Sequence, residues 1–216
     1  MKARNITITI DKAREWFHSG DEALKKVALQ VFSKDELVCD FRSITTFKKA
    51  CEVLGFDYTT TVSAVENIAY YSKSSAAMFK LNIIREALNL GCGLSLTEDP
   101  RGSYIYYPLN PFAFNSSSYY EGELNSGKME VIGKIKSEGE VYNVLGGSAT
   151  SGSDGGLGSF CFGDGVGFAY ANFGFLGCAT KEIAKHFGKY FGMLITEAKY
   201  ADVIEDFEII ESKYSI

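Results

Sequence analysis

Histidine and cysteine are the side chains of this chain whose chemistry can be judged most directly from spacing. The two histidines are His18 and His186, and neither has a cysteine or carboxylate at a metal-ligand spacing. Cys178 precedes an expected helix, where a thiol can become reactive, but the sequence pairs it with no base. We interpret it as a buried structural thiol. We therefore predict no catalytic residue, no metal site and no cofactor, and favour a protein that is not an enzyme.

Aromatic side chains are the other candidates, because tyrosine and phenylalanine rings stack on bases, sugars and partner side chains. The rings fall in two stretches, one near residues 104–120 and one in residues 160–175. Packing inside strands is the structural alternative. The candidate ligand-binding or partner-binding residues are Tyr104, Tyr106, Tyr119, Tyr120, Phe160, Phe162, Phe168, Tyr170 and Phe173.

The second aromatic stretch lies in a segment, residues 146–177, that holds half of the 22 glycines of the chain. Alternating rings favour strands, and we expect them at about 158–162, 166–171 and 173–178. Gly163-Asp164-Gly165 is the expected turn between the first two. The glycine spacing fits neither a Walker loop nor a dinucleotide fingerprint. A glycine loop at 146–158 that closes over a ligand stays open as an alternative.

The elements that position these stretches follow from local patterns. Residues 5–10 alternate as a strand, and Asp11 then caps a short helix. A helical stretch spans about 62–90 and is broken near Ser72–Ser75. Residues 129–135 and 140–144 form a hairpin, and Val203 to Ile210 suits an edge strand.

The last helix is expected to begin after Thr180, a favourable N-cap. Ala184, Gly188 and Gly192 line one stripe of it. Mid-helix glycine is unfavourable, so we expect close packing of this stripe against the β region. Contact between subunits through the stripe, or through exposed aromatic residues, is the alternative.

Composition limits the class of protein. The 216 residues carry a net charge of −5 without a long basic run, so we expect no nucleic-acid partner. No segment resembles a signal peptide or a membrane helix. The cysteines are odd in number and lack a C-x-x-C pair, which favours free thiols in a reducing cytosol. They are Cys39, Cys51, Cys92, Cys161 and Cys178.

These patterns predict an α+β protein. A mainly helical region, residues 1–92, packs with a glycine- and aromatic-rich antiparallel β region and its C-terminal amphipathic helix, residues 93–216. One compact domain is the alternative division.

Several short segments of the chain carry a family resemblance. They are residues 8–17, 28–32, 45–55 and 106–108, and the helix with Glu182, Ile183, Ala184, Lys185, Gly188 and Phe191. These segments resemble uncharacterised proteins of tailed phages and prophages of gut Bacteroidales, including crAss-like phages. The segment 174–180 departs from them, because it lacks the arginine that relatives carry there.

The resemblance implies a phage or prophage protein in the host cytoplasm or the virion. We expect a structural or binding component that contacts a protein partner, or a second copy, through its aromatic β surface. The alternative is a protein or enzyme that binds a small ligand, such as a counter-defence factor that sequesters a nucleotide signal.

Overall fold

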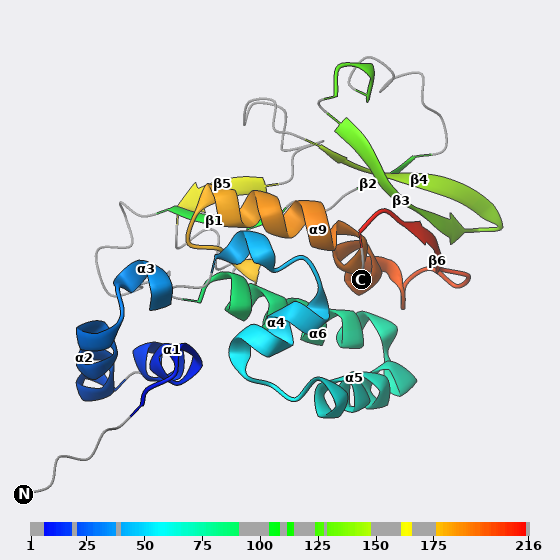
Figure 1. Cartoon of the computed structure of the whole chain (residues 1–216). Coiled ribbons are helices and arrows are strands. Elements are labelled where there is room, and N and C mark those ends of the chain that lie inside the picture. The colour runs from blue at the N-terminus through cyan, green and yellow to red at the C-terminus, as the bar shows by residue number, and fades with distance from the viewer. Residues whose placement is uncertain are drawn as a thin grey trace, which may run out of the picture. The chain divides into compact units, whose positions relative to one another are not determined.

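The computed structural model describes residues 7–18, 21–37, 40–90, 104–108, 112–114, 124–127, 129–147, 161–165 and 176–214. It is an α+β protein, as predicted (Figure 1). The chain divides into two compact units. One comprises Met1–Asp40 with Leu90–Gly93, and the other Phe41–Asn89 with Leu94–Ile216. The compositional boundary near residue 92 stays a prediction.

The smaller unit consists of α1 (Ile10–His18), α2 (Glu22–Val31) and α3 (Lys34–Leu37) around a small core. Asp21 caps α2 as its carboxylate accepts the backbone N–H of Ala23 at 2.8 Å. The core residues are Ala13, Phe17, Ala28 and Leu37.

The strand expected over residues 5–10 is wrong where the structure describes it. Residues 7–9 have no regular structure and Ile10 already begins α1. Ile8 and Ile10 instead pack against the small helical core, so these apolar side chains are partly buried by helices rather than by a sheet. Asp11 lies inside the helix, and the cap is Thr9, whose hydroxyl accepts the backbone N–H of Lys12 at 3.3 Å.

The larger unit begins with the short helix η1 (Phe41–Ser43), followed by α4 (Phe47–Leu54), α5 (Tyr58–Tyr71) and α6 (Lys73–Leu88). Gly55 ends α4 in the left-handed conformation, with φ of 71°. The predicted break at Ser72 is confirmed, because its hydroxyl accepts the backbone N–H of Ser75 at 2.9 Å and begins α6. Asp57 caps α5, which explains why that helix begins before residue 62.

The strands that the structure describes form two antiparallel sheets. β1 (Tyr104–Pro108) pairs with β5 (Cys161–Gly165). The other sheet has the order β2-β4-β3-β6. Its strands are β2 (Phe112–Phe114), β3 (Met129–Ser137), β4 (Glu140–Gly147) and β6 (Glu208–Ser212).

The β3–β4 hairpin is confirmed, and β6 is an edge strand that begins at Glu208 rather than Val203. Glu138 and Gly139 make the hairpin turn with φ of 53° and 79°. The turn expected at Gly163–Gly165 is wrong, since those residues pair with β1 as part of β5.

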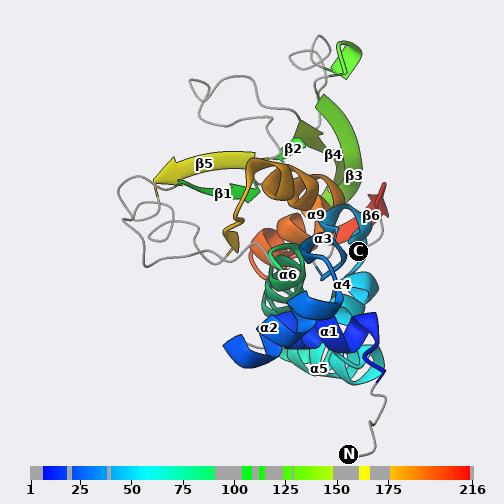
Figure 2. The ribbon, with the colours of Figure 1, turned by 60° about the vertical axis from the view of Figure 1, so that its left-hand side comes forward.

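Helix α9 (Lys181–Tyr200) is the central element of the larger unit and packs against α6, β1, β5, β3, β4 and β6. Figures 1 and 2 show it between α6 on one side and β1 and β5 on the other. Thr180 caps it as predicted, accepting the backbone N–H of Ile183 at 3.2 Å. Ala184, Gly188 and Gly192 are buried, so this stripe is used within the chain and is not an exposed contact for a second copy.

A kink divides α9 at Phe191, whose φ and ψ of −117° and 15° are not helical. Thr196 donates its hydroxyl to the Gly192 carbonyl at 3.0 Å, directly after the kink. Beyond it, Met193 joins the core beneath the four-stranded sheet. The other members of that core are Ile132, Ile135, Val144 and Phe207.

Candidate functional site

The structure brings together the two aromatic stretches that the sequence singled out. Tyr104 and Tyr106 lie in β1, and Phe162 lies in β5, the partner strand. In the register Tyr106 is opposite Gly163, and Phe162 is opposite Tyr107. The ring of Tyr106 is half-buried.

The remaining predicted aromatic residues lie outside the described part of the chain. The same holds for the glycine loop at 146–158 beyond its first two residues, so its closing over a ligand stays a prediction. The residues outside are Tyr119, Tyr120, Phe160, Phe168, Tyr170 and Phe173.

Cys178 pairs with Tyr106 of β1 through two backbone hydrogen bonds. Its N–H donates to the Tyr106 carbonyl at 2.6 Å, and its carbonyl accepts the Tyr106 N–H at 3.2 Å. Its thiol is fully buried and donates to the Leu176 carbonyl at 3.6 Å. Asn89, the C-cap of α6, holds the flanking residues by accepting the Ala179 N–H at 2.8 Å. The prediction that the Cys178 thiol is buried is therefore confirmed.

A row of four rings runs along one side of α9, and we call Phe41, His186, Tyr190 and Tyr214 the aromatic row. The ring centroids of Phe41 and His186 are 5.5 Å apart, and those of His186 and Tyr190 are 4.5 Å apart. The centroids of Tyr190 and Tyr214 are separated by 4.9 Å. His186 Nε2 lies 2.7 Å from the Ile44 carbonyl, which fixes that nitrogen as the protonated donor.

The end of the aromatic row holds a cluster of charged and phenolic groups. Lys213 forms an ion pair with Glu130, and the Tyr214 hydroxyl donates to Glu130 at 3.0 Å. Burial opposes ionisation of Glu130, but the hydrogen bonds from Lys213 and Tyr214 outweigh it and lower its pKa. Burial and the bond to Glu130 raise the pKa of Tyr214.

The partners of this cluster come from β3 and from residues 213 and 214 after β6, so the cluster fastens those two residues to the sheet and to α9. Lys189 adds its ammonium 5.9 Å from the Tyr190 and Tyr214 rings. The charged, phenolic and aromatic groups of this cluster contact one another within the chain. We therefore assign the aromatic row a structural role rather than a binding one.

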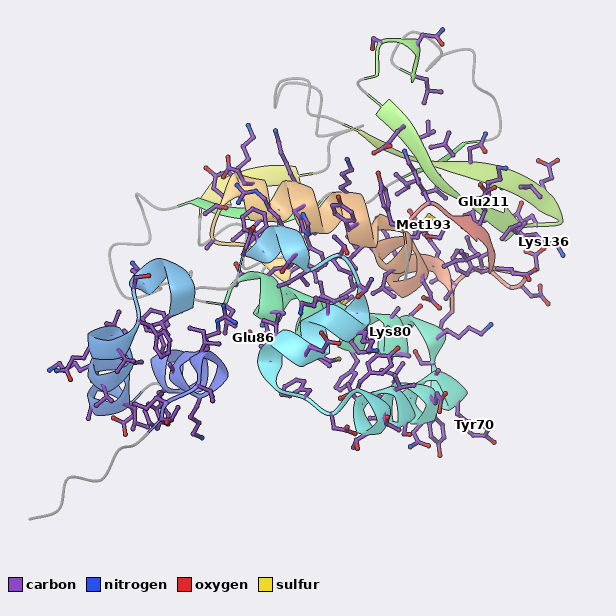
Figure 3. All side chains as sticks on the ribbon, in the orientation of Figure 1. Tyr70, Lys80, Glu86, Lys136, Met193 and Glu211 are labelled. Carbon is purple, nitrogen blue, oxygen red and sulfur yellow. The ribbon has the colours of Figure 1, made fainter. Side chains whose placement is uncertain are left out.

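Three exposed side chains form a second feature, which we call the tyrosine patch: Tyr70, Tyr71 and Val203. Their exposed fractions are 85%, 87% and 77%. The two tyrosine rings meet edge to face at 5.0 Å, and Tyr70 extends away from the end of α5 (Figure 3). Hydrogen bonds from Lys73 and Ser74 to Asp202 bring the neighbour of Val203 to the start of α6.

The sequence analysis predicted the helix break near Ser72 but missed the tyrosine patch, because it sought aromatic binding residues only near residues 104–120 and 160–175. The available signal was the pair Tyr70-Tyr71 directly before the helix break at Ser72. Rings at the last positions of a helix have no following turn to cover them. The patch offers apolar area and phenolic hydrogen-bonding groups to a partner.

Comparison with known proteins gives no relative: no family model, curated protein or solved structure matches the chain. Within the described residues, no group of three His, Cys, Asp or Glu side chains is placed to hold a metal ion. Among the helices that the structure describes, none is both long and apolar enough to cross a membrane.

Proposed function

We propose that this chain is a phage or prophage protein that acts by binding a protein partner, in the host cytoplasm or in the virion. The resemblance of its short segments to proteins of Bacteroidales phages supports the origin. The tyrosine patch supports the mode of action and is the observation that carries the proposal. The aromatic strands β1 and β5 remain part of the proposed contact surface.

The tyrosine patch suits a protein contact for physical reasons. Two adjacent rings that are more than four-fifths exposed leave much apolar surface in water. Tyrosine is enriched at the energetic centres of interfaces, because a rigid ring buries large area and its hydroxyl can still bond. Val203 adds an aliphatic side chain.

The direct test is crosslinking of the protein in infected host cells and in purified virions. We expect the wild-type chain to crosslink to a defined protein, and Tyr70→Ser combined with Tyr71→Ser to lose that product. Val141→Ser is the matched control, because Val141 is an exposed aliphatic residue on β4 with an exposed fraction of 53%. Equal crosslinking of the wild type, the double tyrosine variant and Val141→Ser would refute a role for the patch.

A further inference from the structure

The tyrosine patch continues into an exposed face that runs the length of α5. By helical spacing, Thr59, Ser63, Glu66 and Tyr70 form one stripe, and all four are exposed. The opposite side of the helix is partly or fully buried, with Val65 at 6% exposure. The stripe is therefore the side of α5 that remains available to a partner.

Helix α5 carries less charge than the chain as a whole. The chain has 23% charged residues, whereas Glu66 is the one charged residue among the 14 of α5. Exposed positions carry threonine, serine, asparagine and tyrosine. Interface centres show this depletion of charge together with enrichment in tyrosine.

The order of residues makes the stripe complementary to itself. If two copies of α5 lie antiparallel about a two-fold axis at the middle of the helix, Tyr70 of each faces Thr59 of the other. In the same register Ser63 faces Glu66, so each carboxylate meets a hydroxyl donor rather than another carboxylate. In this register the Glu66 carboxylate can lie in the contact without facing a second carboxylate, although each molecule has a net charge of −5.

We infer that the partner of the α5 stripe is a second copy of this chain, bound antiparallel through α5. The inference rests on the proposed function, since it names the first partner of the tyrosine patch. A helix of 14 residues is about 21 Å long, so the contact is smaller than a standard interface. We expect a dimer that dissociates on the order of 10 μM.

Sedimentation equilibrium of the full chain across the micromolar range measures this dimer directly. We expect Tyr70→Ser with Tyr71→Ser to weaken association at least tenfold. Ser63→Glu places a carboxylate opposite Glu66 and should weaken it about tenfold. Ser63→Glu combined with Glu66→Lys creates two opposite-charge pairs across the axis and should restore association.

The rescue by the double variant tests the antiparallel register, because a merely damaged helix would not recover. Helix content by far-UV circular dichroism confirms that each variant is folded, and Val141→Ser is the control for loss of an exposed aliphatic side chain. A wild-type chain that stays monomeric, or a dimer that ignores all α5 variants, overturns the inference. The crosslinking experiment with another protein then decides the proposed function independently.

Discussion

The backbone of Gly133 in β3 runs directly against the carbonyl of Glu211 in β6. A methyl group added at Gly133 would collide with that oxygen and would lie 2.6 Å from the Met193 Sδ. Met193 and Glu211 are labelled in Figure 3. Glycine at this position therefore allows the edge strand, β3 and the second half of α9 to meet closely.

Gly133→Ala should destabilise the protein by about 1–3 kcal/mol, because the strands must move apart to admit the methyl group. Urea unfolding measures the change. Adding Met193→Ala removes the flexible neighbour but leaves the Glu211 carbonyl in place, so we expect no rescue. If Gly133→Ala cost no stability in the Met193→Ala background, Met193, and not the strand backbone, would be the cause of the strain.

We predict that the protein becomes less stable in acid because of two carboxylates after α9, those of Asp202 and Asp206. The Ser72 hydroxyl lowers the pKa of Asp202, and the N–H groups of Gly139 and Glu138 lower that of Asp206. Their folded pKa values lie below the unfolded value, near 3.8. Their stabilisation is therefore present above about pH 4 and is lost as the pH falls through the lowered values.

The pH dependence can be assigned with variants. Asp202→Asn combined with Asp206→Asn should flatten the acid side of a plot of unfolding free energy against pH. Glu205→Gln is the control, because Glu205 is exposed and lies in the same segment. Parallel curves for the wild type and the double variant would contradict the assignment.

Tyr214 ties the segment after β6 to β3 through its hydrogen bond to Glu130. Tyr214→Phe keeps the ring but removes this hydrogen bond, and should destabilise the protein by about 1 kcal/mol. Tyr70→Phe should change stability by less than about 0.5 kcal/mol, since Tyr70 is 85% exposed. Chemical unfolding of both variants provides the comparison, and equal effects would argue against the tie at Glu130.

Cys51 and Cys178 are both fully buried, and burial raises the pKa of the Cys51 thiol. Alkylation of the native protein followed by peptide mass spectrometry should leave both thiols unmodified. Unfolding in urea should expose them. Labelling of native Cys178 at the unfolded rate would place it in an accessible position and contradict its structural role.

Local chemistry explains what the sequence predicts well. The caps at Asp21, Gly55 and Thr180 act on residues within four positions of themselves, so a short window contains both partners. The β3–β4 hairpin is local in the same sense. Local patterns of this kind predicted the Thr180 cap, the hairpin and the α+β class, but not the starts of α1 and α5.

Long-range partners explain what the sequence could not predict. The His186 ring meets the Ile44 carbonyl across 142 positions, and the Ala179 N–H meets Asn89 across 90. No pattern within a window of residues reveals such pairs. The strand expected at 5–10 fails over residues 7–10, which the structure describes, for a related reason. Alternating isoleucines fit a sheet and a small helical core equally well.

The short connection from α9 to β6 has consequences for how the chain tolerates changes in length. Asp202 holds the start of α6 and Asp206 holds the hairpin turn, and residues 203–205 alone separate the two. An added or deleted residue there would displace one carboxylate from its amides whichever way the chain adjusts. Linkers, tags or inserted domains are therefore better placed in other turns.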